Sequence, residues 1–212
     1  MNPKIILLFL MINILANAQT KNLKLLFIGD SYTIGESVIK VESYPYQLIT
    51  LMSDKNFKVT DFKVVAQTGW STTQLIEGLK NVKVNYDYDY CFLCIGVNNQ
   101  YRKIDFQIFE NEIVTLINYG KARSKNVVLL SIPNYGYTPF GNEKKQEISK
   151  ELKKYNSEIK SKSKELKTKY VSITEISEKN IVKLVAEDNL HPSAFQYSLW
   201  VELIYNKLFG NE

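Results

Sequence analysis

The chain has 212 residues, of which 45% are hydrophobic and 23% charged, with a formal net charge of +5. This composition is that of an ordinary globular protein, and it disfavours intrinsic disorder, collagen and coiled coil. Without a leader, the length suits one domain with a substantial core.

The first residues predict a cleaved leader. Lys4 gives a positive start, Ile5–Leu15 is an apolar run broken only by an asparagine, and Ala16-Asn17-Ala18 has small residues where a signal peptidase cuts. The run is much shorter than the roughly 20 residues that a membrane-spanning helix needs. We therefore expect a signal peptide over residues 1–18, cleavage before Gln19, and a secreted or periplasmic mature protein without a membrane span.

Strand-like and helix-like segments alternate along the rest of the chain. The expected strands are, in chain order, Leu23–Ile28, Val59–Ala66, Tyr90–Ile95, Asn126–Ile132 and a short one near Tyr170–Ile173. The expected helices are Tyr46–Ser53, Thr72–Leu79, one near Phe106–Arg123, a long one over 143–169 and Ala194–Leu208. The last of these helices starts with a capping box of Ser193 and Gln196. Near-continuous apolar strands that alternate with helices predict a parallel sheet covered on both faces. The expected fold class is α/β: residues 19–212 form one three-layer α/β/α domain with a central parallel sheet of about five strands.

The excess positive charge is concentrated in residues 143–169, which hold ten Lys and five Glu. Apolar residues recur there at helical spacing, at Ile148, Leu152, Tyr155, Ile159 and Leu166. A nucleic-acid-binding surface needs charges of one sign, whereas here both signs are mixed. We therefore expect a solvated helix face and no nucleic-acid partner.

Cys91 and Cys94 have the C-x-x-C spacing of some redox and metal sites. Both lie on a predicted strand, where residues three apart point to opposite faces with Cα atoms roughly 10 Å apart. A disulfide needs the two Cα atoms to lie less than about 7 Å apart. The chain has a single histidine and no further cysteine to complete a zinc site. We expect two buried thiols, no metal and no cofactor.

Polar segments follow the first three predicted strands. They are Gly29-Asp30-Ser31-Tyr32, Gln67-Thr68-Gly69-Trp70-Ser71 and Gly96-Val97-Asn98-Asn99-Gln100-Tyr101. Sites in open parallel sheets form at the carboxyl ends of the strands, so the three segments should converge. Together they supply a hydroxyl, a glycine backbone and a carboxamide.

The single histidine is His191, within Asp188-Asn189-Leu190-His191-Pro192. Serine chemistry near neutral pH needs a base, and histidine is the usual one. Pro192 disfavours helical dihedrals at His191, which suits a ring presented from a loop. Asp188 can turn back to the imidazole and fix its tautomer. A lone histidine is more often structural and Gly-Asp-Ser is common in turns, so the joint pattern carries the prediction.

That joint pattern resembles the SGNH hydrolase family, also called GDSL esterases, from about Leu23 to Leu208. Gly29-Asp30-Ser31 is similar to the family's first block, Gly69 to the glycine of the second, Gly96-Val97-Asn98 to the third and Asp188-x-x-His191 to the fifth. Asn99 departs from the pattern, because many relatives carry Asp there. The chain has no Gly-x-Ser-x-Gly around Ser31 and no Gly-x-Gly-x-x-Gly after the first strand, which disfavours an α/β-hydrolase and a dinucleotide fold.

The resemblance implies a role for each matching residue. Ser31 attacks the acyl carbonyl, His191 transfers the proton, and Asp188 orients His191. The backbone N–H groups of Ser31 and Gly69 and the Asn98 side chain hold the oxyanion.

The substrate is less sharply indicated than the chemistry. Trp70, Tyr101 and the loop Tyr135–Phe140 follow strand ends, so Trp70, Tyr101 and Tyr135 are candidates for substrate binding, although they also suit a core or a rim. We expect a small-molecule or carbohydrate ester, either short-chain or O-acetyl. Lysophospholipids or thioesters are the alternative substrates, and an acyltransferase would use the same residues. A non-catalytic carbohydrate-binding relative would not need Ser31, His191 and Asp188 together. No oligomeric state is indicated.

Overall fold

The structure is a computed structural model that describes residues 20–179 and 181–210. The predicted signal peptide, residues 1–18, and its cleavage site before Gln19 lie outside this part of the chain. Across the described ranges, no helix combines the length and the apolar character needed to cross a membrane.

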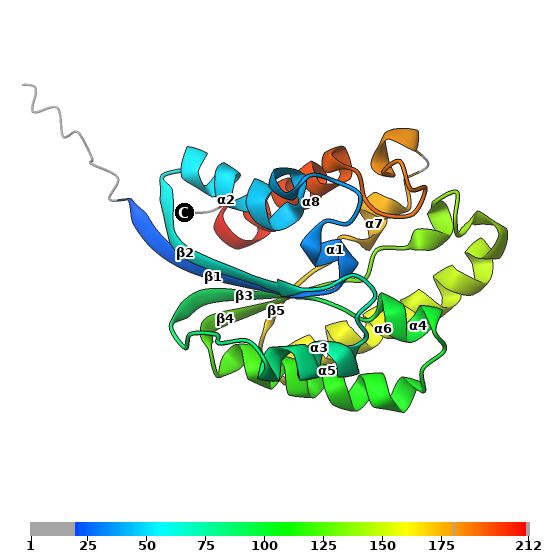
Figure 1. Cartoon of the computed structure of the whole chain (residues 1–212), viewed down its shortest axis with the longest axis horizontal. Helices are drawn as coiled ribbons and strands as arrows, with labels where there is room; N and C mark the ends of the chain where they lie inside the picture. Colours follow the sequence, from blue (N-terminus) through cyan, green and yellow to red (C-terminus); the bar gives the residue numbers. More distant parts are fainter. Residues whose placement is uncertain (1–19, 180, 211–212) are drawn as a thin grey trace, which may run out of the picture.

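Five parallel strands form one sheet, and the predicted α/β fold class is confirmed (Figure 1). The strands are β1 (Lys21–Gly29), β2 (Phe57–Ala66), β3 (Tyr88–Cys94), β4 (Ser124–Leu130) and β5 (Lys169–Val171). Their order across the sheet is β2-β1-β3-β4-β5, and every neighbouring pair is parallel. Each strand expected from the sequence is present, with bounds that differ by a few residues.

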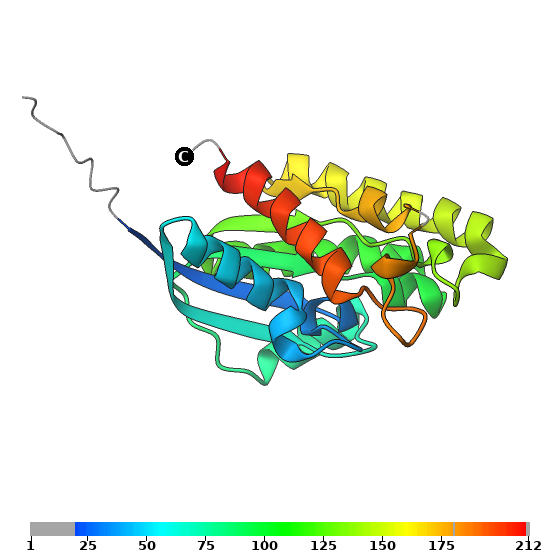
Figure 2. The same ribbon diagram turned by 90° about the horizontal axis from the view of Figure 1, so that it is seen from above.

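Helices cover both faces of the sheet, which gives the three layers (Figure 1). One face carries α1 (Ser31–Ile34), α2 (Tyr44–Asp54), α7 (Thr174–Ser177) and α8 (Ala194–Phe209). The other carries α3 (Thr72–Lys80), α4 (Val97–Tyr101), α5 (Phe106–Lys121) and α6 (Lys145–Glu165). Seen from above, α2 and α8 lie side by side across the sheet (Figure 2). The short helices α1, α4 and α7 were not expected from the sequence.

Burial on both faces explains the apolar runs of the strands. Phe27 of β1 and Phe92 of β3 are fully buried and stack with ring centroids 5.0 Å apart. Cys91 and Cys94 are buried free thiols, as predicted. Burial raises the pKa of Cys91 to about 12, so this thiol stays protonated and unreactive.

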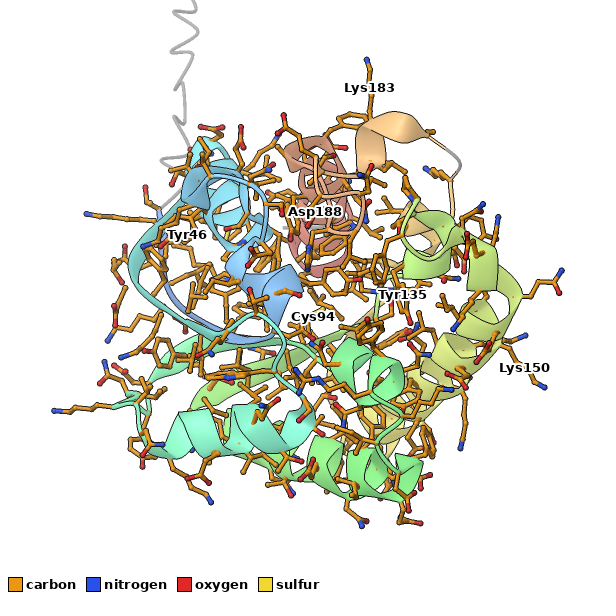
Figure 3. The ribbon with its side chains drawn as sticks, turned by 45° about the vertical axis from the view of Figure 1, so that its right-hand side comes forward. Tyr46, Cys94, Tyr135, Lys150, Lys183 and Asp188 are labelled. Carbon is orange, nitrogen blue, oxygen red and sulfur yellow. The ribbon has the colours of Figure 1, made fainter. Side chains whose placement is uncertain are left out.

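The Lys- and Glu-rich segment forms α6, preceded by a short 3-10 turn at Asn142–Lys144. Ile148, Leu152, Tyr155 and Ile159 are buried. Charged side chains occupy the outer face, where the labelled Lys150 projects away from the molecule (Figure 3). The expected solvated helix is confirmed.

Two helix starts differ in how their backbone N–H groups are capped. The Ser193 hydroxyl accepts the Gln196 N–H at the start of α8 (3.1 Å), which is one of the two bonds of the predicted capping box. Both bonds are present at α3, where Ser71 and Gln74 cap each other.

The strand order creates a crevice between β1 and β3. Their last residues, Gly29 and Cys94, are paired. The chain leaves β1 toward α1 on one face and leaves β3 toward α4 on the other (Figure 1). Ligands of open α/β sheets bind at such a switch point, beyond the carboxyl ends of the strands. The fold therefore brings the segments after β1 and β3 to the place where a site is expected.

Candidate functional site

A cavity of about 330 Å³ opens at this crevice. Its lining residues are Ser31, Tyr32, Thr68, Gly69, Val97, Asn98, Tyr101, Tyr135, Phe140, Leu190 and His191. The segments after β1, β2 and β3 thus converge with the loop before α8. Most residues that the sequence singled out meet here.

Ser31 is the first residue of α1 and is 4% exposed. Asp30 caps the helix, because its carboxylate accepts the Tyr32 N–H at 3.1 Å. Burial raises the pKa of Asp30 to about 7, against the hydrogen bonds from backbone N–H groups. The cap fixes where the Ser31 side chain leaves the backbone.

His191 is held by Asp188, three residues earlier. The His191 Nδ1 atom lies 2.5 Å from Asp188 Oδ2, and Asp188 Oδ1 accepts the His191 N–H (2.9 Å) and the Leu190 N–H (3.0 Å). The Ala186 N–H closes the loop by donating to the His191 carbonyl (2.8 Å). The imidazole also packs edge-on against Tyr32, with centroids 5.8 Å apart. The ring is therefore oriented by contacts on two sides.

Asp188 is a strongly stabilised anion. Partial burial works to raise its pKa, but hydrogen bonds from the Ser37 hydroxyl, the His191 ring and two backbone N–H groups outweigh burial, so the pKa lies well below its usual range. An ionised Asp188 favours the tautomer of His191 with a proton on Nδ1. The other ring nitrogen, Nε2, is then the one able to accept a proton.

Ser31 and His191 line the same cavity. Within the described residues, no hydrogen bond joins the Ser31 hydroxyl to the His191 ring. Catalytic hydrogen bonds are often long without substrate and tighten when it binds.

Three residues that line the cavity, Ser31, Gly69 and Asn98, carry N–H donors. Gly69 has φ of +82°, a backbone conformation that glycine adopts without strain. Across the described residues, neither its N–H nor that of Ser31 donates a hydrogen bond within the protein. The Asn98 amide donates one hydrogen bond to the Trp70 carbonyl (3.0 Å), which leaves its second N–H available.

Asn99 points away from this cavity toward the start of α3. Its Oδ1 accepts the Thr72 N–H (3.0 Å), and its Nδ2 donates to the Thr72 hydroxyl (2.7 Å). The Thr72 hydroxyl in turn donates to Glu112 of α5 (2.5 Å). Asn99 thus connects α4 to α3, and within the described residues its side chain hydrogen-bonds to no candidate catalytic group.

The aromatic candidates for substrate binding separate into two groups. Tyr101 and Tyr135 line the cavity together with Phe140, with centroids 6.1 to 6.4 Å apart. Trp70 does not line it, and the indole packs over Gly78 of α3 instead. Only the backbone carbonyl of Trp70, through Asn98, contacts the site.

No role for Ser37, Thr68 or Tyr32 was predicted from the sequence, although Thr68 and Tyr32 lie in the polar segments after the strands. Ser37 contacts Asp188 across 151 positions of the chain, so no local spacing signals the contact. Thr68 and Tyr32 adjoin residues that were predicted. Their roles depend on side-chain direction, which the sequence pattern alone does not give.

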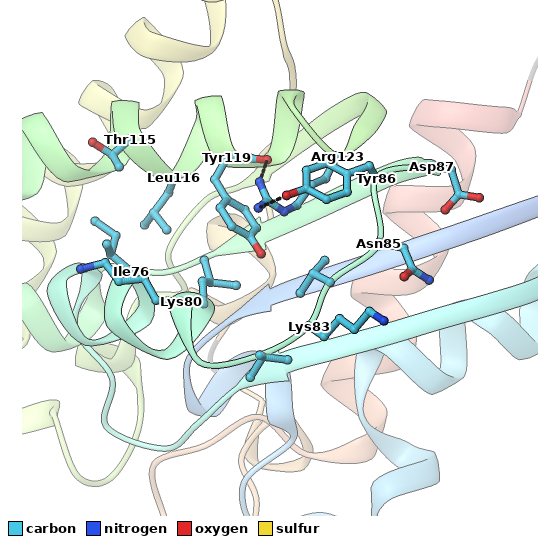
Figure 4. Close-up of a pocket in the computed structure, with 13 residues that line it drawn as sticks. Ile76, Lys80, Lys83, Asn85, Tyr86, Asp87, Thr115, Leu116, Tyr119 and Arg123 are labelled. Carbon is cyan, nitrogen blue, oxygen red and sulfur yellow. Dashed lines mark hydrogen bonds between the residues drawn. The ribbon is translucent and has the colours of Figure 1, made fainter.

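A larger cavity of about 920 Å³ lies between α3 and α5 (Figure 4). Arg123 is placed against the rings of Tyr86 and Tyr119 and donates to the Tyr86 hydroxyl and the Tyr119 carbonyl. The lining contains no histidine, serine or cysteine. The cavity at the crevice, rather than this one, contains groups suited to nucleophilic chemistry.

Residues 27–199 match the GDSL-like lipase/acylhydrolase family. Among curated proteins, none matches the chain. The solved structures that are similar to this chain include three with esterase or lipolytic descriptions. A lipolytic G-D-S-L protein from Veillonella parvula is 17% identical with a TM-score of 0.72, and the match covers 89% of this chain and 99% of that one. An acetylxylan esterase from Geobacillus stearothermophilus is 18% identical with a TM-score of 0.67, and the match covers 90% of this chain and 96% of that one. A psychrotrophic esterase from Pseudoalteromonas sp. is 16% identical with a TM-score of 0.66, and the match covers 89% of this chain and 99% of that one.

Proposed function

This chain belongs to the GDSL-like lipase/acylhydrolase family and is a carboxylic ester hydrolase, and from that premise we propose that it acts through an acyl-enzyme on Ser31. His191 is the general base and Asp188 orients it. The observation that carries the proposal is the Nδ1–Oδ2 distance of 2.5 Å between His191 and Asp188, with Ser31 and His191 lining one cavity. His191 is the only histidine, so no other imidazole competes for the role.

In the first half of the reaction, the Ser31 Oγ forms a bond to the acyl carbon while its proton passes to His191 Nε2. The tetrahedral oxyanion accepts hydrogen bonds from the Ser31 and Gly69 N–H groups and from the Asn98 amide. The intermediate collapses, the bond to the alcohol oxygen breaks, and that oxygen takes the proton from His191.

In the second half, water attacks the acyl-enzyme. Its proton passes to His191, and the bond between Ser31 Oγ and the acyl carbon then breaks. Ser31 recovers its proton, and the carboxylic acid leaves. Transfer to an alcohol in place of water uses the same residues and makes the protein an acyltransferase.

Cavity size favours a small acyl group. The volume of about 330 Å³ is at the low end for ligand sites. We propose short-chain esters or O-acetyl groups of carbohydrates as the substrates, with lysophospholipids or thioesters as the alternative. The fold shared with an acetylxylan esterase is in keeping with the first choice.

The aromatic wall suggests where the alcohol part of the substrate lies. Tyr101 and Phe140 are 56% and 51% exposed, and with Tyr135 they border a second cavity of about 230 Å³. Exposed ring faces suit the apolar faces of sugar rings, so Tyr101 and Tyr135 are proposed to contact the substrate, and Phe140 to extend the same wall. Trp70 is left out of this proposed contact surface because it packs on α3.

We further propose that residues 1–18 are a signal peptide, which makes the mature protein secreted or periplasmic. The mass of protein recovered after expression with its own leader tests this. Export with cleavage gives a chain that begins at Gln19, whereas retention of residues 1–18 contradicts it.

The activity is tested with purified wild type and Ser31→Ala on p-nitrophenyl esters of increasing acyl length, acetylated sugars, lysolipids and thioesters. We expect turnover to be highest on acetyl esters and to be lost in Ser31→Ala. Equal turnover in both proteins contradicts the mechanism. Turnover of no ester, combined with binding of carbohydrate, supports a non-catalytic carbohydrate-binding protein.

A further inference from the structure

The Ser37 hydroxyl donates a hydrogen bond to Asp188 Oδ2 at 2.6 Å. This oxygen is the same one that contacts His191 Nδ1. Oδ1 is already occupied by the two backbone N–H groups of the loop before α8. Ser37 is therefore the one side chain besides His191, among the described residues, that hydrogen-bonds to this carboxylate.

Ser37 makes this contact from a strained backbone. Its φ is +66°, in the left-handed region that residues other than glycine seldom occupy. Such a conformation is disfavoured for serine and persists only where surrounding contacts hold it. The hydrogen bond to Asp188 is the only one that the Ser37 side chain makes within the described residues.

The same short segment also contacts the loop after β2. Glu36 accepts a hydrogen bond from the hydroxyl of Thr68, which lines the cavity next to Gly69. The N–H groups of Gly35 and Glu36 both donate to the carbonyl of Ser31. Residues 35–37 therefore connect the segment of the nucleophile to the loop of Gly69 and to Asp188.

We propose that Ser37 is a positioning residue of the catalytic site: its hydroxyl holds the Asp188 carboxylate in the orientation that aligns His191. The proposal rests on the proposed esterase function of Ser31, His191 and Asp188. Ser37 does not contact the reacting atoms. Its loss should therefore slow the chemical step more than it weakens substrate binding.

Ser37→Gly separates this role from a purely structural one. Glycine adopts φ of +66° freely, so the substitution relieves backbone strain while it removes the hydroxyl. A structural role predicts full activity in Ser37→Gly. A positioning role predicts that kcat falls about tenfold on a short ester, with KM unchanged and a melting temperature close to that of wild type.

Two further variants complete the set. Lys167→Gly is the matched control, because Lys167 is exposed, has φ of +52° and lies after α6, away from the cavity. Its kcat should equal that of wild type. Ser37→Asn keeps a hydrogen-bond donor and tolerates the left-handed region, so it should recover part of the lost kcat.

A spectroscopic readout does not depend on turnover. The chain has one histidine, so protein labelled with ¹⁵N-histidine gives the resonances of His191 alone. Wild type should show a slowly exchanging, downfield Nδ1–H signal, and Ser37→Gly should lose it or move it upfield. An unchanged signal and an unchanged kcat in Ser37→Gly overturn the inference. Turnover that is independent of Ser31 instead contradicts the proposed function.

Discussion

The Asn98 carboxamide donates a hydrogen bond to the backbone carbonyl of Trp70 across 3.0 Å. This bond joins the segment after β3 to the segment after β2, next to Gly69. One amide N–H fixes the side chain, and we propose that the other donates to the substrate oxyanion. A donor held in place before the reaction costs no reorganisation in the transition state.

Asn98→Ala should therefore lower kcat by about 10²–10³ with little change in KM, because the donor acts on charge that develops in the transition state. Steady-state kinetics on a short p-nitrophenyl ester measure this. Asn81→Ala is the matched control, since the Asn81 amide also donates to a backbone carbonyl, that of Glu77 (3.1 Å), but at the far end of α3. A kcat loss of similar size in both variants would contradict a specific role for Asn98.

Asn99→Asp should destabilise the fold by roughly 1–3 kcal/mol. Asn99 is fully buried and donates to Thr72, whose hydroxyl then donates to Glu112. An ionised aspartate cannot donate, so the Thr72 hydroxyl must then serve two carboxylates with one proton. Urea unfolding measures the loss of free energy.

Combining Glu112→Gln with Asn99→Asp should restore part of that stability. A glutamine at position 112 can donate to the Thr72 hydroxyl, which is then free to donate to the carboxylate introduced at position 99. The double variant should therefore be more stable than the sum of the single changes predicts. Additive effects would show that the three side chains are not coupled.

Asp30→Asn should change how stability depends on pH. The pKa of Asp30 is raised from 3.8 to about 7 by burial, so the folded state binds its proton more tightly than the unfolded state does. Wild type should therefore lose stability relative to Asp30→Asn as pH rises from about 4 to 7, by an amount on the order of 4 kcal/mol. Urea unfolding at pH 5 and pH 8 measures the part of this loss that lies between pH 5 and the pKa of about 7, roughly 3 kcal/mol.

The difference between pH 5 and pH 8 can be assigned to Asp30 for two reasons. The lowered pKa of Asp188 gives stability that is lost only as pH falls below about 4, so it is constant between pH 5 and 8. Asp105→Asn is the control, because Asp105 caps α5 in the same way but is exposed. It should keep the pH dependence of wild type. If Asp30→Asn has the same pH dependence of stability as wild type, the raised pKa of the buried Asp30 carboxyl is refuted.

Much of the fold could be predicted because its signals are local. Short segments rich in apolar residues identified all five strands, although Val59–Ala66 also contains Thr60, Asp61 and Lys63. The stripe of Ile148, Leu152, Tyr155 and Ile159 identified α6. The short helices α1, α4 and α7 were missed, since four or five residues are too few to show a helical period.

For the candidate site, the residue types came from the sequence, and their positions along the chain favoured serine hydrolase chemistry over the alternatives. A single histidine determined the candidate base, and Asp188 lies near enough in the chain to reach it. Side-chain direction was harder to predict. Trp70 turned to α3 and Asn99 turned to Thr72, because packing and hydrogen bonding around each residue decide where it points.

By itself, the sequence determined the alternation of strands and helices, the two buried thiols and the residues able to carry serine chemistry. Only the tertiary structure decided that β1 lies next to β3, which brings Ser31 and Asn98 to one cavity, and that Ser37 reaches Asp188. The physical reason is the separation along the chain of the residues that interact. Hydrophobic periodicity and helix capping act between residues a few positions apart, whereas strand order and contacts across 151 positions depend on how the whole chain packs.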